Sequence, residues 1–243
     1  MNIYTKPNLY DAIHKNHDLD IKLLRTITSK ISGPVLELAS GTGRLTKCIL
    51  DLGLEYTGLD ISKKFLEVAK KKYNSQAHFV LGDMREFKLN KEFNFVFIGF
   101  NSFLHNLTIK DAYNCLKCVN MHLKKKGKFL VSIFIPNPDF LYRELNTLYP
   151  ATSFFHYKNS KCRIMESNVY DDKSQVNKLT WYIESNNQII PDEYHYSMRM
   201  YYPHEMDILF DESGFKIEHK FGDYDCSPME AESGMQIYLC EKY

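Results

Sequence analysis

A turn in the first fifth of the chain carries residue types that could do chemistry. Residues 37–43 read Glu-x-Ala-x-Gly-x-Gly and overlap the end of a short apolar run at 35–38. Glycines at a strand end let a ligand approach the backbone closely, because no Cβ stands in the way. A helix that starts behind them offers unpaired N–H groups. The spacing therefore predicts a ligand site at a strand-to-helix turn, with an ordinary structural turn as the alternative.

The same segment differs from two glycine-rich loops that bind phosphates. It lacks the Lys-Ser/Thr pair with which a P-loop holds nucleotide phosphates and magnesium. It also lacks the third glycine of a dinucleotide-binding turn, since Thr46 stands at that position. The acidic Glu37 suits a cation, either the ammonium of an amino acid or the amides of the loop itself. The segment therefore argues against NAD and against a phosphate ligand.

Two aspartates follow the next two apolar runs of the chain. Asp60 ends the run at 56–59, where a carboxylate can accept both hydroxyls of a ribose. Asp83 follows residues 78–81 and can accept from the exocyclic amine of adenine, with Met84 against the ring. Taken singly, Asp60 could be a helix cap and Asp83 a turn residue. Because ligands in parallel sheets bind at the carboxyl ends of strands, three successive strand ends with such groups predict a nucleoside site.

The elements that must position these residues alternate between strand and helix. This alternation is typical of a parallel sheet with crossover helices. We expect strands at 34–38, 56–59, 78–81, 93–97, 128–134, 215–221 and 235–240. We expect helices at 8–31 with a break near 16–18, and at 43–52, 62–73, 108–123, 139–149 and from 203 to a stop at Gly214.

Residues 162–201 differ in character from the first half. They contain three polar, β-branched and aromatic stretches, separated by turns rich in Asp, Ser and Asn. The three stretches are 162–170, 178–184 and 193–201. This pattern predicts antiparallel strands with one exposed face. We expect a single domain over 1–243, with a helical N-terminal segment at 1–32 and an antiparallel insertion at about 150–202.

The composition of the whole chain limits its class. The 243 residues are 44% hydrophobic and carry a formal net charge of +1, with acidic and basic residues interleaved. Nucleic-acid binders usually have a clear basic excess, so nucleic acid is not the expected partner, and Lys124–Lys126 is expected to be a solvated turn. No run approaches the ~20 apolar residues of a membrane span, and the first residues lack the apolar stretch of a signal peptide. We expect a soluble, cytoplasmic protein without a membrane partner, and the oligomeric state stays open, a homodimer included.

Cys115 and Cys118 form a C-x-x-C motif. They lie within an expected helix, and no second pair or nearby histidine cluster completes a zinc site. Helical i, i+3 spacing places both thiols on one face, where half-buried cysteines are common. We therefore expect core packing and no bound metal, with redox or metal use as the alternative.

These motifs together resemble the class I S-adenosylmethionine-dependent methyltransferases, and the layout resembles a bacterial small-molecule subgroup. The resemblance implies a Rossmann-like, doubly wound, seven-stranded and mostly parallel sheet with an antiparallel seventh strand, and an inserted antiparallel β-sheet lid over the active site. It implies S-adenosylmethionine as cofactor and S-adenosylhomocysteine as product. Ser40 departs from the cysteine often found at its position. The implied cofactor residues are Tyr10, Glu37, Ala39, Ser40, Gly41, Thr42, Gly43, Asp60, Ile61, Asp83, Met84, Arg85, Phe100 and Asn101.

The resemblance also indicates where the methyl acceptor binds. His105 stands near the expected exit of the fourth strand and is the candidate general base, with a structural histidine as the alternative. Residues 101–104 lack the Asp/Asn-Pro-Pro-Tyr/Phe motif of enzymes that methylate planar amines of nucleic-acid bases. We expect in-line methyl transfer to an N or O nucleophile of a small molecule; the alternatives are an RNA or protein methyltransferase and a non-catalytic binder of the cofactor. The substrate residues implied are Asn101, His105, Arg199, Tyr201 and Tyr224.

Overall fold

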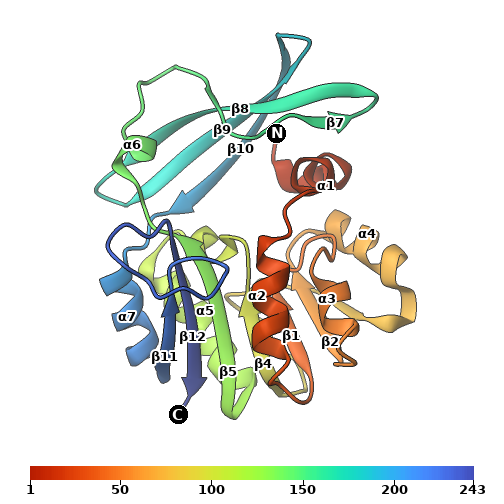
Figure 1. Cartoon of the computed structure of the whole chain (residues 1–243), viewed down its shortest axis with the longest axis vertical. Coiled ribbons are helices and arrows are strands. Elements are labelled where there is room, and N and C mark those ends of the chain that lie inside the picture. The colour runs from red at the N-terminus through yellow and green to blue at the C-terminus, as the bar shows by residue number, and fades with distance from the viewer. The chain divides into compact units, whose positions relative to one another are not determined.

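The computed structural model describes residues 1–243 as two compact units (Figure 1). One unit comprises Met1–His17 and Pro136–Met200, and we call it the antiparallel-sheet unit. The other comprises Asp18–Ile135 and Tyr201–Tyr243, and we call it the parallel-sheet unit. The helical segment expected at 1–32 therefore divides between the two units.

A seven-stranded sheet forms the frame of the parallel-sheet unit. Its strand order is β11-β12-β5-β4-β1-β2-β3, and every neighbouring pair is parallel except the two that contain β12. The predicted mostly parallel sheet with an antiparallel seventh strand is confirmed. The strands are β1 (Val35–Leu38), β2 (Tyr56–Asp60), β3 (His78–Leu81), β4 (Phe93–Ile98), β5 (Leu123–Phe134), β11 (Phe215–Phe221) and β12 (Met235–Lys242).

Helices cover both faces of this sheet, and in Figure 1 α2 lies in front of it and α5 behind it. Ser62 accepts from Phe65 N and caps α4, while Thr108 and Asp111 form a capping box at the start of α5. These caps fix where the two helices begin. The helices are α2 (Leu19–Thr28), α3 (Thr46–Leu50), α4 (Lys63–Tyr73), α5 (Ile109–His122) and α7 (Pro203–Glu212), with the 3-10 turns η2 (Asn74–Gln76) and η3 (Ser102–His105).

The central strands of this sheet are buried on both faces. All four residues of β1 are buried, and so are five of the six residues of β4. Parallel strands with helices on both sides need this near-continuous apolar character. The close-packed frame fixes the strand ends, from which the candidate site residues extend.

Antiparallel strands form a separate sheet in the antiparallel-sheet unit, as predicted. The order is β10-β9-β8-β6, and β7 also pairs with β8. Asn186 and Asn187, both with positive φ, form the two-residue turn between β9 and β10. Met1 O accepts from His195 N at 2.8 Å, which ties the N-terminus to β10. The elements are η1 (Ile3–Thr5), α1 (Pro7–His14), α6 (Pro138–Leu141), β6 (Tyr149–Pro150), β7 (Phe155–Tyr157), β8 (Ser160–Asp171), β9 (Val176–Ser185) and β10 (Gln188–Arg199).

Three local predictions were wrong in extent or type. The helix expected at 43–52 is only α3, because Gly43 has a φ of +76°, which a right-handed helix excludes. The helix expected at 139–149 stops at Leu141, since Asn146 has a φ of +61° and Tyr149–Pro150 pairs with β8. Lys124–Lys126 is exposed as expected but belongs to β5 rather than to a turn.

Cys115 and Cys118 are core residues, as expected from their helical spacing. They are 0% and 6% exposed, and all six cysteines of the chain are free. Burial raises the pKa of both thiols. Cys118 Sγ also donates to Arg85 O at 3.5 Å, so it helps to fasten the segment after β3 to α5.

Candidate active site

The ends of four parallel strands meet at one edge of the seven-stranded sheet. The register pairs Leu38 of β1 with Leu59 of β2 and with Ile98 of β4. One residue further on, Asp60 of β2 pairs with Leu81 of β3. The segments that leave these strands therefore start side by side. They are 39–43, 60–62, 82–85 and 99–105.

The turn after β1 has a left-handed backbone at three of its five residues. Ala39, Gly41 and Gly43 have φ values of 57°, 58° and 76°. Glycine adopts this region without strain, whereas a residue with a Cβ, such as Ala39, does so at a cost. A Cβ on Gly43 would also lie 2.8 Å from the ring of Tyr73, whose hydroxyl donates to Gly43 O at 2.8 Å. The two glycines are thus required by conformation, and Gly43 also by space.

Asp60 joins the turn after β1 to the end of β2. Its Oδ2 accepts from Gly41 N and its Oδ1 from Ser62 N, each at 2.7 Å. Burial raises the pKa of Asp60, and the two amides partly offset this effect. Each carboxylate oxygen has a second lone pair. Asp60 can therefore hold the turn and still accept a ribose hydroxyl.

Gly58 allows the turn to lie against β2. A Cβ at this position would stand 2.7 Å from Ser40 Oγ and 2.9 Å from the Tyr56 hydroxyl. Ser40 Oγ is buried and has no hydrogen-bond partner within the chain. Buried polar atoms normally have partners, so an unpaired oxygen in this turn fits a polar ligand. In the sequence, Gly58 is marked by its position two residues before Asp60, the acid that ends β2.

Glu37 lies within β1 beneath the turn and is 4% exposed. Its Oε2 accepts from the Tyr56 hydroxyl at 2.5 Å. Burial raises the pKa of Glu37 to about 8, although the Tyr56 hydrogen bond and the charge of Arg44 both lower it. The carboxyl is therefore largely protonated at neutral pH. The expected role of Glu37 toward an ammonium stays a prediction.

Arg44 links the turn to α2 and to the exit of β4. Its Nη1 and Nη2 donate to the two carboxylate oxygens of Asp20 at 2.8 and 2.5 Å. Its guanidinium carbon lies 5.0 Å from the centre of the Phe100 ring, within the range of a cation–π contact. Asp20 is only 2% exposed. This pair could not be predicted from the sequence, because its partners are 24 positions apart and belong to no common local motif.

Phe100 and Asn101 form a strained turn at the end of β4, with φ values of 53° and 63°. Hydrogen bonds fasten this turn to β5. Phe100 N donates to Ser132 Oγ at 3.1 Å, and Asn101 Oδ1 accepts from Phe134 N at 2.8 Å. His105, the candidate base, ends η3 four residues later and is half-buried. Its role in catalysis stays a prediction.

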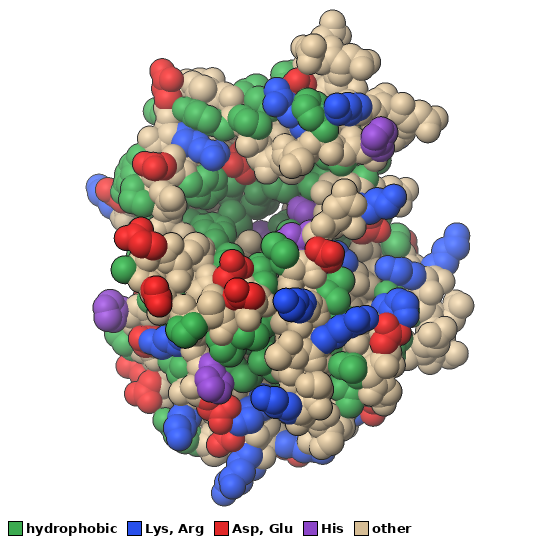
Figure 2. Space-filling view, viewed as in Figure 1, with side chains coloured by type: hydrophobic (Ala, Val, Ile, Leu, Met, Phe, Trp, Pro, Cys, Tyr) green, Lys and Arg blue, Asp and Glu red, His purple; other side chains and the backbone are tan.

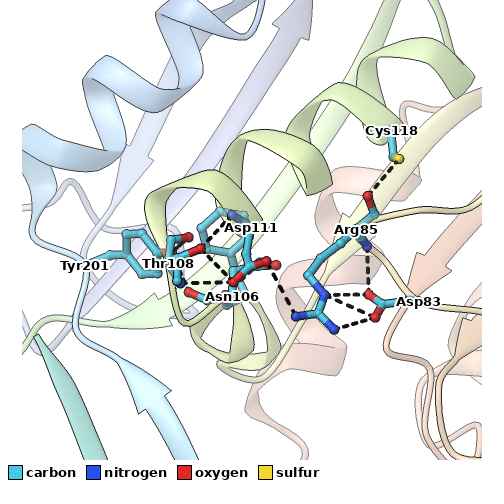
Figure 3. Close-up of polar contacts among 8 residues, drawn as sticks. Asp83, Arg85, Asn106, Thr108, Asp111, Cys118 and Tyr201 are labelled. Carbon is cyan, nitrogen blue, oxygen red and sulfur yellow. Dashed lines mark hydrogen bonds and ion pairs between the residues drawn. The ribbon is translucent and has the colours of Figure 1, made fainter. Parts of the chain in front are cut away.

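Arg85 holds the carboxylate of Asp83 (Figure 3). Arg85 Nε donates to Asp83 Oδ1 at 2.9 Å, and Nη2 donates to Oδ2 at 2.5 Å. These hydrogen bonds lower the pKa of Asp83, and they outweigh the opposing effect of burial. Asp83 is therefore ionised at neutral pH, as an acceptor for an adenine amine should be. Arg85, expected among the cofactor residues, acts in this structure on Asp83.

The polar contacts of Arg85 continue toward the start of α5 (Figure 3). Arg85 Nη1 lies 3.6 Å from Asp111 Oδ1 in the capping box. The Tyr201 hydroxyl donates to Asn106 O at 2.5 Å and to Thr108 O at 3.3 Å. Tyr201 is fully buried, so it fastens the segment that carries His105 to the start of the C-terminal part of this unit. Its expected contact with substrate stays a prediction.

The remaining expected site residues divide between the two units. Tyr224 lies in the loop between β11 and β12, where burial and the nearby Asp20 raise its pKa to about 12. Arg199 and Tyr10 belong to the antiparallel-sheet unit, where Arg199 Nη2 donates to Gln175 Oε1 at 2.5 Å. Their roles stay predictions. Thr42 is 4% exposed, Ile61 is 66% exposed and Met84 is half-buried.

The surface shows side chains of both charges. In Figure 2, acidic and basic groups both occur across the visible face of the parallel-sheet unit, in keeping with the formal net charge of +1. No group of three or more His, Cys, Asp or Glu side chains is placed to hold a metal ion. None of the helices is both long and apolar enough to cross a lipid bilayer.

Comparison with known proteins agrees with this geometry. Residues 35–127 match the family described as a methyltransferase domain. YqeM from Bacillus subtilis (strain 168), which is named "Putative methyltransferase YqeM", is 23% identical over 214 residues, covering 86% of this chain and 84% of YqeM. The CcbJ methyltransferase of Streptomyces caelestis has a TM-score of 0.82 at 21% identity, covering 99% and 98% of the two chains. The sugar N-methyltransferase KedS8 of Streptoalloteichus sp. ATCC 53650 has a TM-score of 0.72 at 12% identity, covering 95% and 90%.

Proposed function

Because residues 35–127 match a methyltransferase domain, we propose that this chain transfers a methyl group from S-adenosylmethionine to an amine nitrogen of a small molecule. One observation carries the cofactor part of the proposal. The Asp60 carboxylate bridges Gly41 N and Ser62 N, directly beside the strand end that leads to Asp83. Glycine backbone, ribose acceptor and adenine acceptor thus share one edge of the sheet, where ligands of such sheets bind.

The residues of this edge have distinct roles in the proposal. The turn at 39–43 accommodates the methionine part of the donor, and the unpaired Ser40 Oγ gains a partner there. Asp60 accepts from the ribose hydroxyls, and Asp83, kept ionised by Arg85, accepts from the adenine amine. The bound donor supplies an electrophilic methyl group on its sulfonium. Strained Phe100 and Asn101 fix the exit of β4, whose position sets the direction of in-line attack.

A small-molecule amine is the acceptor that the molecule supports best. KedS8, of similar fold, is named as a sugar N-methyltransferase. The chain has no basic excess with which to bind a nucleic-acid backbone. It also lacks the two prolines with which enzymes of planar base amines shape their site. These points favour a flexible or aliphatic amine over a nucleobase.

An aliphatic amine is largely protonated at neutral pH and must lose a proton before it attacks the methyl group. We assign the acceptance of this proton to His105, at the end of η3. A histidine has an ordinary pKa near neutrality, which suits this task. Tyr201 fixes the carbonyls of Asn106 and Thr108 directly after His105, so the segment is firmly placed.

Methyl transfer from labelled donor tests the proposal. Purified protein is incubated with methyl-labelled S-adenosylmethionine and, separately, with the small-molecule, RNA and protein fractions of a cell extract. We expect label in the small-molecule fraction, chromatographing as amines, together with released S-adenosylhomocysteine. Asp60→Ala should abolish the transfer. Label confined to RNA or protein, or none in any fraction, would contradict the proposed function.

A further inference from the structure

Two successive residues at the exit of β4 have a left-handed backbone, and neither is glycine. Phe100 and Asn101 have φ values of 53° and 63°. Asparagine occurs in this region more often than most residues, whereas a bulky residue such as phenylalanine is an outlier there. The chain has a glycine directly before the pair, Gly99, but Gly99 is not at a positive φ. The strain therefore falls on Phe100, where a glycine would relieve it.

Ser132 of β5 holds both backbone amides of this pair. Phe100 N donates to Ser132 Oγ at 3.1 Å, and Asn101 N donates to Ser132 O at 3.0 Å. The last paired residues of β4 and β5 are Ile98 and Val131, so Ser132 is the first residue of β5 beyond the end of β4. The register of the sheet thus brings Ser132 to the amides of the strained pair.

Packing alone does not call for a hydroxyl at Ser132. The residue is 2% exposed and lies between Val131 and Ile133, which are both fully buried. A β-branched apolar residue fits a buried strand position at least as well. The Ser132 side chain also hydrogen-bonds to Tyr224, which lowers the pKa of Tyr224 against the effect of burial. The hydroxyl can therefore donate to Tyr224 and accept from Phe100 N at the same time.

Phe100 is held at its ring as well as at its amide. The guanidinium carbon of Arg44 lies 5.0 Å from the ring centre, and Arg44 is itself held by Asp20 of α2. Arg44 directly follows the glycine turn at 39–43. The strained pair therefore adjoins that turn, and a change of backbone at Phe100 would alter the edge to which we assign the donor.

The contacts on the strained pair exceed what a plain connection between β4 and η3 needs. Besides the two amides and the ring, Asn101 Oδ1 accepts from Phe134 N at 2.8 Å. A connection that only joined two elements could use glycine in place of Phe100 and would need none of these contacts. Costly backbone conformations persist only where their surroundings over-determine them, and they cluster at functional sites. The contacts thus fix Phe100 and Asn101 in one conformation before any ligand binds.

We propose that Ser132 is a positioning residue for the methyl donor. Its hydroxyl and its carbonyl hold Phe100 and Asn101 in the left-handed conformation in which the exit of β4 receives S-adenosylmethionine. Without the hydroxyl the pair relaxes, and the apparent affinity falls with the fraction of chains that retain the strained conformation. The inference rests on the placement of the donor in the proposed function, and it is independent of the acceptor.

Titration calorimetry with S-adenosylhomocysteine measures this effect without an acceptor. We expect Ser132→Ala to weaken binding about tenfold, as when about one chain in ten retains the strained conformation. Ser132→Thr keeps the hydroxyl and should bind within about twofold of wild type. Thr28→Val removes another buried hydroxyl of the same unit, which donates to Leu24 O at 2.5 Å, and should leave the affinity unchanged. Equal affinities in wild type and Ser132→Ala would overturn the proposal.

Relief of the strain separates positioning from general stability. Glycine reaches a left-handed φ without help, so Ser132→Ala should cost no more than about twofold when it is added to Phe100→Gly. The same loss with and without Phe100→Gly would show that Ser132 does not act by holding Phe100, and would contradict the proposal. Ser132→Cys keeps the volume but accepts hydrogen bonds only weakly. It should therefore lose affinity in the same way, and it carries the test where Ser132→Ala does not fold.

Failure of the inference and failure of the proposed function give different results. Binding of S-adenosylhomocysteine by wild type, with no loss in Ser132→Ala, overturns the inference alone. The expected loss in Ser132→Ala, together with methyl label in RNA or protein instead of amines, refutes the proposed acceptor and supports the inference. A wild-type chain that does not bind S-adenosylhomocysteine overturns both.

Discussion

The two units of the molecule place their polar groups in different ways. In the parallel-sheet unit, Asp60 and Gly41 meet through backbone amides at adjacent strand ends, so strand register alone brings them together. In the antiparallel-sheet unit, Tyr4 and Tyr196 meet through side chains of elements far apart in the sequence. The first arrangement is set by the backbone of the sheet. The second is set by the packing of side chains, since Tyr4 and Tyr196 both pack against the apolar core of their unit.

Removing the carboxylate at the strand ends should give the largest effect. We expect Asp60→Ala to weaken S-adenosylhomocysteine binding on the order of 1,000-fold, because hydrogen bonds to a charged acceptor contribute about 1.5–3 kcal/mol each. Titration calorimetry measures this. Asp172→Ala, an exposed acid in the antiparallel-sheet unit, serves as control. Unchanged S-adenosylhomocysteine binding in Asp60→Ala would contradict the role given to this carboxylate.

Neutralising the buried acid under the turn should stabilise the protein at high pH. The pKa of Glu37 is about 8 when folded against an ordinary 4.5. Its contribution to stability is therefore complete below pH 4.5 and is lost as the pH rises toward 8. Glu37→Gln carries no such loss, so its stability relative to wild type should rise on the order of 4 kcal/mol between pH 4.5 and 8.5.

Urea denaturation across this pH range measures the effect of Glu37→Gln. Glu232→Gln, an exposed acid of the same unit, should show a flat difference from wild type. If the difference in unfolding free energy between Glu37→Gln and wild type does not change with pH, the Glu37 carboxyl is ionised in the folded, ligand-free chain. That result would contradict the raised pKa of Glu37.

Removing the hydrogen bonds from Arg85 to Asp83 should weaken cofactor binding less than Asp60→Ala does. The loss should arise at the end of the site that we assign to adenine. We expect Arg85→Gln to weaken S-adenosylhomocysteine binding about tenfold at neutral pH, because an oriented charge-assisted pair is lost. Arg85 lowers the pKa of Asp83, so without it Asp83 protonates at a higher pH and affinity should fall earlier on acidification. Fluorescence titration from pH 4 to 7 measures the shift. Lys88→Gln, on the same segment, is the control, and an acid limb identical to wild type would exclude the role given to Arg85.

The smallest expected effect is at Tyr201. Tyr201→Phe removes the hydroxyl that donates to Asn106 O and Thr108 O. We expect a loss of about 1 kcal/mol in unfolding free energy, with methyl transfer reduced. Wild-type stability and wild-type methyl transfer in Tyr201→Phe would contradict the role given to these two hydrogen bonds.

The cofactor edge could be predicted from the sequence because its determinants are local. Glycine at a left-handed position and an acid at the end of a strand are each specified within a few residues, as with Gly41 and Asp60. The alternation of strands and helices then predicts a mostly parallel sheet, although not the order of its strands. Glu37 could be singled out in the same way, but not its hydrogen bond to Tyr56, which depends on the register of β1 and β2.

Contacts between distant segments could not be predicted in this way. Asp20 and Arg44 pair across 24 positions, and the ring of Tyr4 in η1 neighbours that of Tyr196 in β10. The helix expected at 139–149 failed because pairing of Tyr149–Pro150 with β8 overrides the local helical pattern. Such tertiary pairing leaves no local signal in the sequence.

Titration of the wild-type chain with S-adenosylhomocysteine tests the central claim most directly. If the strand ends carrying Gly41, Asp60 and Asp83 bind the nucleoside, calorimetry should show one site per chain and no heat with NAD under the same conditions. Absence of binding, or equal binding of NAD, would contradict the account.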